Sequence, residues 1–341
     1  MLKIKLSQLK PGVKLGKDIF TFDGNLLLPK GSIVSKEQLE QFARRNIEEV
    51  YLWEESSKIK SQVDFQEVYK DSLAVTREFM LEAKLGKPID EKEINATVEM
   101  LVCQVFDQND LFHQMRIMKE KDEYLFTHSV NVSLLCILIG RWMKYSDEKI
   151  KELGLAGLLH DIGKVKVPDH ILQKPDTLTP EEFEVVKKHT IDGYNLLVDL
   201  PWINESMANA VLMHHERADG SGYPLGLKGV KINNYASIVA VADVYDAMTS
   251  ERIYSDKVSP YTAVETLWND SFGKLDPRIS KVFYDKITDF YVGNEVLLSN
   301  NERGLVVYID PGQPTRPIIK VGDEFYNLAE DRSLTILEII D

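Results

Sequence analysis

Apolar residues recur with a helical period through most of the middle of the chain. A spacing of three or four residues places them on one face of an α-helix, which the protein interior then covers. Prolines separate these stretches, as is typical of loops between helices. The stretches are Leu125–Trp142, Ile150–Leu159, Glu181–Val198 and Met207–His215. The pattern predicts a helix-dominated domain over residues 107–292.

The first 56 residues have a mixed pattern. Two short apolar runs flank the turn-forming Asp23-Gly24-Asn25, which predicts a β-hairpin. Ser35 followed by Gln38 has the spacing of a capping box and predicts a helix that ends near residue 47. Residues 49–53 then have the pattern of a strand. We expect a small α+β domain over residues 1–56.

Two further segments flank the central helical domain. Residues 57–106 are helical in pattern, either as a connector or as a helical hairpin that packs on the next domain. After Gly293, short β-like runs alternate with turns, which predicts a small β-rich barrel or sheet over residues 293–341. The predicted fold class is therefore mainly α, with small domains at both ends. For both end domains, structural packing is favoured over ligand sensing.

Composition is that of an ordinary globular protein, with 44% hydrophobic and 28% charged residues. No run reaches the roughly 18 apolar residues of a membrane span. The strongest, Val130–Gly140, contains Asn131 and Ser133. Cys103 and Cys136 lack a CxxC spacing and fit buried thiols in a reducing compartment. We predict a cytoplasmic location without membrane insertion.

The formal net charge of −13 limits the choice of partners. Such a surface repels DNA and acidic membranes, so neither is expected to bind. An anionic substrate can still bind where local cations overcome the overall field. Bound metal ions would supply such cations, so the charge favours a focused site over a broad basic groove.

Histidines and acidic residues gather in the helical domain. Six of the seven histidines lie from His128 to His215, and five of them, all but His170, are next to other unusual features. A single histidine on an apolar face is more often a structural residue, but these occur with other unusual features. The groups are His128, His160-Asp161 followed by Ile162-Gly163-Lys164, His189, His214-His215 followed by Glu216 and the loop Asp219-Gly220-Ser221-Gly222-Tyr223-Pro224, and Asp243 within an apolar run.

These residue types favour a metal centre. An ionised aspartate in apolar surroundings is costly unless it is paired or coordinated. Each doublet, His160-Asp161 and His214-His215, would place two ligands about 100° apart if it lay within a helix. Five imidazoles and two carboxylates are too many ligands for one ion and suit two ions that share a carboxylate. Nitrogen and oxygen ligation without thiolates favours Fe or Mn, with Ni or Zn as alternatives, over Ca or Mg.

The quoted motifs resemble those of the HD-GYP family. The resemblance rests on the run His160 to Lys164 and on His214 through Tyr223-Pro224, and it covers about residues 107–292. It implies an all-helical HD-type catalytic domain with a metal centre that hydrolyses cyclic di-GMP to the linear dinucleotide or to GMP. By position, it implies one metal on His128, His160, Asp161 and Asp243. It implies a second on His189, His214 and His215, with Asp161 as the bridge.

The resemblance also implies a mechanism. A hydroxide that bridges the metals would attack a phosphorus whose non-bridging oxygens lie on the ions. Lys164 would neutralise developing charge or assist the leaving oxygen, with a plain surface lysine as the alternative. Arg252 matches a phosphate-clamping arginine, and the alternative is a surface ion pair. Tyr223 would stack on guanine or hydrogen-bond to it. Asp246 is expected to lie behind the ligands or to face solvent, as are Glu216 and Glu123.

Two positions depart from the family pattern. Members with three metals have a glutamate one turn before the first histidine, where this chain has Tyr124. Glu123 is adjacent but points about 100° away on a helix. Two metals are therefore predicted. The family often has a lysine three residues after the arginine, where this chain has Ser255, and Lys257 is a candidate substitute.

Three functions are compatible with these residues. The favoured one is a phosphodiesterase that acts on cyclic di-GMP. The second keeps the site but changes the substrate to cyclic GMP–AMP or a linear dinucleotide, since no residue identifies guanine. The third is a non-catalytic cyclic-dinucleotide receptor or scaffold, which bound metal would argue against. The other partners that we consider are a second copy of the chain or a signalling protein.

Overall fold

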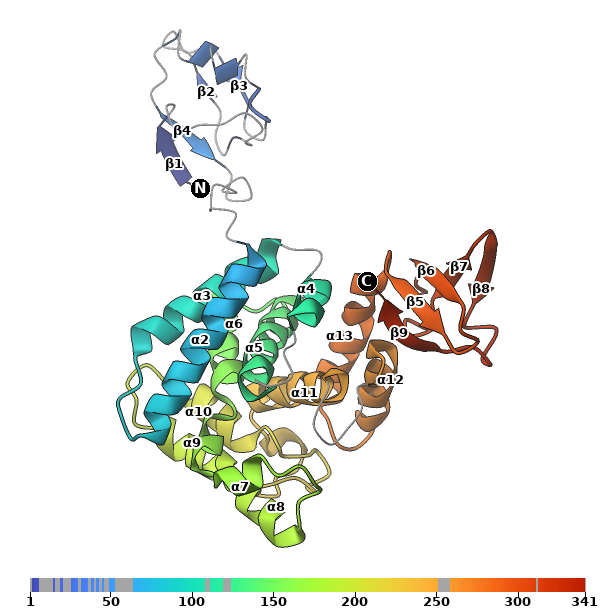
Figure 1. The fold of residues 1–341 in the computed structure, drawn as a ribbon. Coiled ribbons are helices and arrows are strands. Elements are labelled where there is room, and N and C mark those ends of the chain that lie inside the picture. Colours follow the sequence, from blue (N-terminus) through green and yellow to red (C-terminus); the bar gives the residue numbers. More distant parts are fainter. Residues whose placement is uncertain are drawn as a thin grey trace. The chain divides into compact units, whose positions relative to one another are not determined.

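The computed structural model describes residues 2–5, 15, 19–20, 26–29, 32–35, 38–39, 41–42, 45, 49–52, 64–107, 111–118, 124–250, 258–310 and 312–340. The chain divides into two compact units, residues 1–64 and 65–341 (Figure 1).

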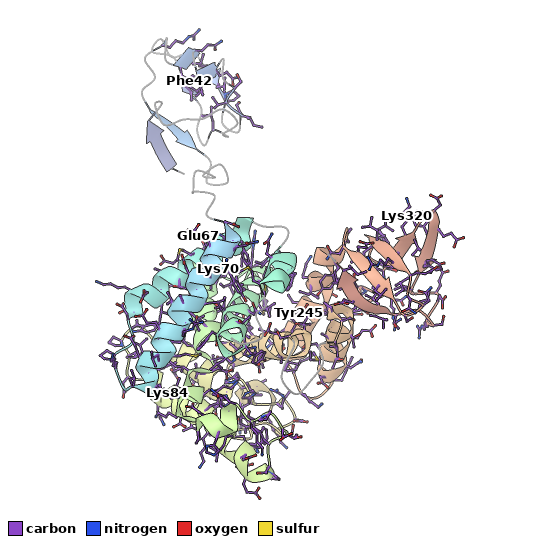
Figure 2. All side chains as sticks on the ribbon, viewed as in Figure 1. Phe42, Glu67, Lys70, Lys84, Tyr245 and Lys320 are labelled. Atoms are coloured by element: carbon purple, nitrogen blue, oxygen red, sulfur yellow. The ribbon has the colours of Figure 1, made fainter. Side chains whose placement is uncertain are left out.

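The first unit contains two small antiparallel sheets. Strand β1 (Leu2–Lys5) pairs with β4 (Glu49–Leu52), and β2 (Ile19–Phe20) pairs with β3 (Leu26–Leu28), so the predicted hairpin and strand are present. The capping box is also present, because the Ser35 and Gln38 side chains each accept a hydrogen bond from the other's backbone N–H. Phe42, labelled in Figure 2, belongs to a small core whose other members are Leu15, Ile19, Leu28 and Val34.

The second unit is largely helical, which confirms the predicted mainly α fold. Several helices begin at a side-chain cap, such as Ser146, Thr179, Asn204 and Ser259. The elements are α2 (Phe65–Lys84), α3 (Glu91–Asp107), α4 (Leu111–Ile117), α5 (Tyr124–Trp142), α6 (Asp147–Leu159), η4 (Ile162–Lys166), α7 (Asp169–Leu172), α8 (Pro180–Lys187), α9 (His189–Leu197), α10 (Glu205–Met213), η5 (Gly229–Lys231), α11 (Asn234–Thr249), α12 (Pro260–Asp270), α13 (Pro277–Ile287) and η6 (Thr288–Tyr291).

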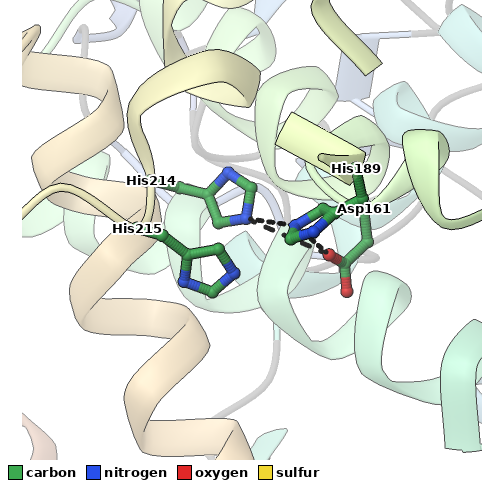
Figure 3. A group of neighbouring side chains, drawn as sticks. All are labelled: Asp161, His189, His214 and His215. Carbon is green, nitrogen blue, oxygen red and sulfur yellow. Dashed lines mark hydrogen bonds and ion pairs between the residues drawn. The ribbon is translucent and has the colours of Figure 1, made fainter. Parts of the chain in front are cut away.

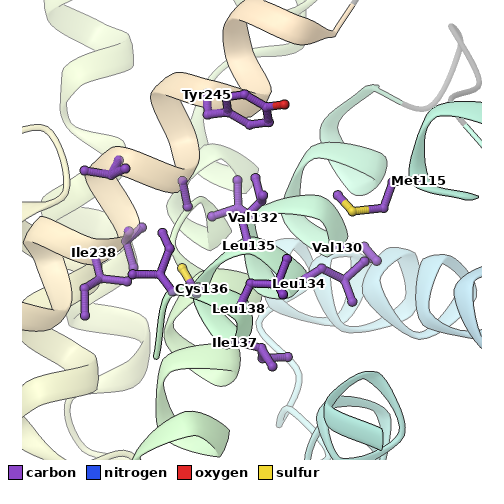
Figure 4. Close-up of a cluster of buried hydrophobic side chains, with 14 of the residues drawn as sticks. Met115, Val130, Val132, Leu134, Leu135, Cys136, Ile137, Leu138, Ile238 and Tyr245 are labelled. Atoms are coloured by element: carbon purple, nitrogen blue, oxygen red, sulfur yellow. The ribbon is translucent and has the colours of Figure 1, made fainter. Parts of the chain in front are cut away.

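Helix α5 is the centre of this unit. Its composition and length would suffice to cross a membrane, but 78% of its most apolar window is buried inside the protein. Apolar residues cover its whole circumference because α2, α3, α6, α11 and α13 pack around it. Figure 4 shows its side chains between Ile238 of α11 on one side and Met115 of α4 on the other. The helix therefore forms the core against which the site is built.

Helices α2 and α3 pack on the central helices. Helix α2 contacts α3, α5 and η4, and α3 also contacts α6. Their buried residues belong to the same hydrophobic core as α5. Of the two arrangements expected for residues 57–106, the described part forms a packed helical hairpin. The four domain boundaries proposed from the sequence stay a prediction.

The chain from Glu295 onward forms an antiparallel sheet of five strands in the order β8-β7-β6-β5-β9. The β-like runs predicted from the sequence are residues 295–298, 304–309, 317–321 and 334–340. They match the strands β5 (Glu295–Leu298), β6 (Arg303–Tyr308), β7 (Ile318–Val321) and β9 (Ile336–Ile340). Strand β8 (Glu324–Asn327) was not predicted, because its residues are exposed or half-buried and show no apolar alternation. In Figure 1 the sheet follows α13 and lies beyond α12.

The apolar stretch predicted over Glu181–Val198 is two helices. Helix α8 ends and α9 begins at Lys188, which caps both. His189 is consequently the first residue of α9 rather than a residue within a longer helix. This break sets the direction of its side chain.

Candidate metal centre

Seven side chains from five parts of the helical unit converge on one place. Six are buried, and the His215 side chain is 19% exposed. His160 and His214 are the C-caps of α6 and α10, and Asp161 is the N-cap of η4. His128 and Asp243 lie within α5 and α11. The two doublets therefore lie at helix ends, where the chain turns, and not within helices as the sequence geometry assumed.

The seven residues form two groups of candidate metal ligands. One group is Asp161, His189, His214 and His215, and the other is His128, His160 and Asp243. Within each group the candidate ligand atoms all lie within 4.8 Å of one another. Two ligand atoms that each lie about 2.1 Å from one ion are at most about 4.2 Å apart, so each group is close to the size that one ion requires.

Asp161 lies between the two groups. Its Oδ1 atom is 3.3 Å from Nε2 of His189 and 3.9 Å from Nε2 of His214. Its Oδ2 atom is 3.3 Å from Nε2 of His160 and 3.7 Å from Nε2 of His128. One oxygen thus faces each group, which is the arrangement of a carboxylate shared by two ions. Figure 3 shows the His189 ring between Asp161 and His214.

Three imidazoles are held by backbone carbonyls. Nδ1 of His160 lies 2.8 Å from the carbonyl of Gly157, Nδ1 of His189 lies 2.6 Å from that of Val186, and Nδ1 of His214 lies 2.8 Å from that of Val211. A carbonyl can only accept, so each Nδ1 carries the proton. In the neutral ring, Nε2 then has a lone pair directed into the cluster.

The lone pairs make the cluster unfavourable without a cation. Nε2 of His189 and Nε2 of His214 lie 3.4 Å apart, although neither has a proton to share once Nδ1 donates. Nε2 of His160 and Oδ1 of Asp161 are buried and have no hydrogen-bond partner among the described residues. Buried polar atoms without partners are costly, and divalent ions would satisfy all four. The residues present therefore fit a metal centre.

Burial keeps several of the imidazoles neutral. It lowers the pKa of His189 to about 4 and that of His215 to about 3, against the opposing charges of Asp161 and Asp243. Burial and the neighbouring imidazoles also hold the pKa of His214 well below its usual range. Neutral imidazole is the form that binds metal, so these three rings are prepared for ligation.

The carboxylates are ionised despite their burial. Burial alone would raise the pKa of Asp161, but the adjacent His160 imidazole and the ammonium of Lys164 hold it well below its usual range. A hydrogen bond from His128 holds the pKa of Asp243 below its usual range in the same way. The centre thus presents negative oxygen ligands together with neutral nitrogens, which suits divalent transition metals.

His128 is held in a different way. Its Nδ1 lies 2.7 Å from Oδ2 of Asp246, and its Nε2 lies 3.1 Å from Oδ1 of Asp243. Burial alone would lower its pKa, but these two hydrogen bonds raise it to about 9. Asp246 is buried behind His128, as one of the two alternatives for this residue anticipated. No pattern along the chain indicated that Asn131, on the same face of α5, donates to Oδ1 of Asp246 at 2.9 Å.

Glycines allow the elements of the site to approach closely. A Cβ atom at Gly163 would lie 1.9 Å from the carbonyl oxygen of His189, so η4 can contact α9 only with glycine there. At Gly157 it would lie 2.9 Å from the backbone of α5 at Ser133. The first contact brings Asp161 to His189. The second brings α6 to α5, and the rings of His128 and His160 are 5.1 Å apart.

Two of the expected substrate-binding residues lie at the cluster. Lys164 donates to Oδ2 of Asp161 at 2.5 Å, and its side chain is 20% exposed. The Tyr223 ring lies 4.7 Å from that of His215 and 6.3 Å from that of Phe183. The ammonium of Lys187 lies 5.6 Å from the centre of the Tyr223 ring. Sequence reasoning missed Phe183 and Lys187 because α8 carries no motif.

Other expectations have mixed outcomes. Arg252, Ser255, Lys257 and Glu123 lie outside the described residues. Tyr124 stacks on His128, with ring centres 5.4 Å apart. Glu216 is buried and accepts hydrogen bonds from the backbone N–H groups of Leu225 and Leu227, so it shapes the loop that follows Tyr223.

A separate cavity of about 840 Å³ lies between α10, the start of α11 and the turn before α13. Glu216 borders it, but none of the seven clustered side chains lines it. The chemistry of the cluster therefore lies outside this cavity.

Residues 113–279 match the family described as HD domain. A protein from Pseudomonas aeruginosa named cyclic di-GMP phosphodiesterase is 36% identical over 242 residues, which cover 70% of this chain and 58% of that protein. One of the same name from Thermotoga maritima is 40% identical over 190 residues, or 53% of this chain and 51% of that protein. The chain thus spans only a little over half the length of these curated relatives.

One further relative and one solved structure are also similar to this chain. A protein from Vibrio cholerae named 3'3'-cGAMP-specific phosphodiesterase 1 is 33% identical over 176 residues, 51% of this chain and 41% of that protein. The structure of Bd1817, described as a HDG"Y"P protein from Bdellovibrio bacteriovorus, superposes with a TM-score of 0.53. The two sequences are 20% identical, and the superposition covers 84% of this chain and 99% of the other. At this identity the likeness shows the fold alone.

Proposed function

We propose that the chain is a metal-dependent phosphodiesterase that hydrolyses cyclic di-GMP to the linear dinucleotide, to GMP, or to both, because residues 113–279 match the HD domain family and the histidine and aspartate motifs resemble those of the HD-GYP family. The observation that carries the proposal is Asp161, whose two oxygens face two groups of candidate ligands. Such a shared carboxylate is suited to two ions that act together on one phosphodiester.

The two ions are assigned to the two groups. His128, His160, Asp161 and Asp243 would hold one, and His189, His214 and His215 would hold the other together with Asp161. Fe or Mn fits the mixture of neutral nitrogens and carboxylates, and Ni or Zn is the alternative. When bound, a pair of divalent ions lowers the pKa of a water and offsets charge on the phosphodiester oxygens.

Two ions are favoured over three. Tyr124 occupies the position from which a further carboxylate would reach a third ion, and its ring stacks on His128. A phenol in that place covers the ring face of His128 and offers no carboxylate oxygen. The count of two is therefore supported by the packing of Tyr124.

Three residues are assigned to the substrate. Lys164 would place its ammonium next to the phosphate, because it already donates to Asp161, and would stabilise charge on the leaving oxygen or give it a proton. Tyr223 would stack on or hydrogen-bond a guanine base, with Phe183 beside it. Arg252, which lies outside the described residues, is proposed from the sequence as a phosphate clamp.

Cyclic GMP–AMP is the second candidate substrate, because a Vibrio cholerae relative carries that specificity in its name. We place the activity in the cytoplasm, since neither Cys103 nor Cys136 is disulfide-bonded. A homodimer or a signalling partner is not required by the site.

Product analysis tests the proposal. Protein loaded anaerobically with Fe(II) or Mn(II) would be incubated with cyclic di-GMP, 3'3'-cyclic GMP–AMP and linear diguanylate in separate reactions, and products would be separated by chromatography. The proposal expects cyclic di-GMP to react with the highest kcat/KM. Preferred turnover of cyclic GMP–AMP would select the second candidate. Intact substrates with fully loaded protein would leave only a binding function.

A further inference from the structure

A chain of hydrogen bonds leads from the metal centre to the first helix of the second unit. His128 donates from Nδ1 to Asp246 at 2.7 Å, and Asn131 donates from Nδ2 to the other oxygen of Asp246 at 2.9 Å. The Tyr69 hydroxyl in turn donates to Oδ1 of Asn131 at 2.7 Å. Each of the four residues is 2% exposed or less.

The geometry of the helices explains this series of hydrogen bonds. His128 and Asn131 are three residues apart on α5, and Asp243 and Asp246 are three residues apart on α11, so each pair shares one face. The two faces meet, and Asp243 and Asp246 both contact the His128 ring. Tyr69 of α2 completes the chain from a third helix, and α2 packs directly on α5.

Three of the other imidazoles are oriented by nearby backbone rather than by distant side chains. His160, His189 and His214 each bond to a carbonyl three residues earlier in the chain, so local backbone geometry fixes their orientation. His128 instead depends on Asp246, and the orientation of Asp246 depends on Asn131 and Tyr69. A carboxylate behind a ligating histidine fixes its ring and raises its basicity.

We propose that Tyr69 is a positioning residue for the metal centre, contributed from outside the segment that matches the HD domain. That segment begins at residue 113, whereas Tyr69 lies one turn after the start of α2. The inference rests on the metal centre of the proposed function but not on the identity of its substrate.

The physical reason is the orientation of one amide. Asn131 must direct its NH₂ group at Asp246, and this is the orientation that also lets its oxygen accept from Tyr69. Without the Tyr69 hydroxyl, the buried oxygen of Asn131 loses this partner and the amide is less firmly held. Asp246 and His128 are then held less firmly as well, and the ion on His128, His160 and Asp243 binds less tightly.

The test is a Mn(II) titration of the metal-free, full-length protein, with bound and free Mn(II) separated by electron paramagnetic resonance. The Mn(II) binding step that is lost in Asp243→Ala belongs to the group with His128. Tyr69→Phe should weaken that same step by about 3- to 10-fold, less than the roughly 10- to 100-fold typical of a residue that contacts a ligand directly, and leave the other step unchanged. Asp246→Asn should weaken it by about 10- to 100-fold.

Two controls separate positioning from a general loss of stability. Tyr291→Phe also removes a buried hydroxyl, one that lies 2.6 Å from the Tyr245 hydroxyl in the core, and it should change neither step. If Tyr69→Phe does not fold, Asn131→Ala interrupts the series of hydrogen bonds at its middle. The matched control for that variant is Ser133→Ala on the same helix. Ser133 donates to the Gly154 carbonyl at 2.8 Å and is outside the chain.

The outcomes are distinct from those of the proposed function. Equal Mn(II) affinities in Tyr69→Phe and Tyr291→Phe would overturn the inference, as would equal weakening of both steps or a wild-type protein that binds no metal. A wild-type protein that binds two ions but hydrolyses no cyclic dinucleotide would overturn the proposed function. The inference about Tyr69 would then still be decided by the titration.

Discussion

The two halves of the candidate metal centre are supported in different ways. The half made by His189 and His214 sits at helix ends, with each Nδ1 on a carbonyl of the preceding turn. The half made by His128 and Asp243 sits within two long helices, with His128 oriented by a side chain. A ring anchored on backbone is insensitive to distant side chains, whereas one anchored on a side chain transmits their changes. Asp161 belongs to both halves.

Asp161→Ala should have the largest effect, because it removes the residue that both halves share. We expect metal to be lost from both groups and kcat/KM to fall by at least about 1,000-fold. The measurement is metal per chain together with turnover on the same sample. Asp192→Ala, at a partly exposed carboxylate on α9, is the control and should retain both. Retained activity in Asp161→Ala would refute the shared carboxylate.

Gly163→Ala tests the half that depends on backbone. The added methyl group would lie 1.9 Å from the His189 carbonyl oxygen, so α9 must shift and carry His189 with it. We expect a loss of about 1–3 kcal/mol in the free energy of unfolding and a weaker metal site at His189. Gly273→Ala, where a methyl group meets nothing within 4 Å, is the control. Equal denaturant midpoints for the two variants would contradict this account of the contact.

Lys164→Met separates substrate chemistry from metal binding. Lys164 touches Asp161 from outside both groups, so its removal should leave metal content near that of the wild type. Loss of a positioned proton donor or cation should reduce kcat by about 100-fold. Lys166→Met, at a half-exposed lysine 3.6 Å from Asp192, is the matched control. A parallel fall in metal content and kcat would instead show that Lys164 holds Asp161 in place for metal binding.

The pH dependence of the metal-free protein should distinguish the halves most finely. The folded-state pKa values of His189 and His215, about 4 and 3, are below the unfolded value of about 6.5. Their contribution to the free energy of unfolding is therefore complete above pH 6.5 and is lost as the pH falls towards 4. The pKa of His128, raised to about 9, gives the opposite sign. Its contribution is complete below pH 6.5 and is lost as the pH rises through 9.

Thermal melting of chelator-treated protein at pH 5, 6.5 and 9 measures this difference. We expect a maximum near pH 6.5, with losses on the order of a few degrees on either side. His128→Gln should flatten the alkaline side only, and His189→Gln the acidic side only. The same alkaline loss in His128→Gln as in the wild type would contradict the proposed role of Asp243 and Asp246.

The sequence allowed much of this to be predicted where local patterns decide the structure. The helical period of residues 125–142 predicted α5, and the spacing of Ser35 and Gln38 predicted a capping box, because each depends on neighbouring residues. The motif around His160 and His214 predicted which side chains would gather. Their placement at helix ends was not predicted, since it depends on where α6 and α10 stop.

Contacts between distant helices could not be predicted in the same way. Tyr69 and Asn131 are 62 residues apart, and nothing in the spacing of either links it to Asp246. Lys187 and Phe183 meet Tyr223 only because α8 ends at Lys187 and the chain turns beside the loop. Strand β8 was missed because a short exposed strand has no apolar alternation. These features arise from packing rather than from local sequence.

The most direct test of the central claim is product formation followed as metal is added. Metal-free protein would be titrated anaerobically with Fe(II) or Mn(II), with metal per chain and products of cyclic di-GMP measured at each point. We predict that linear dinucleotide or GMP appears in proportion to the chains that hold two ions. Full turnover with one ion per chain, or intact cyclic di-GMP with two, would contradict it.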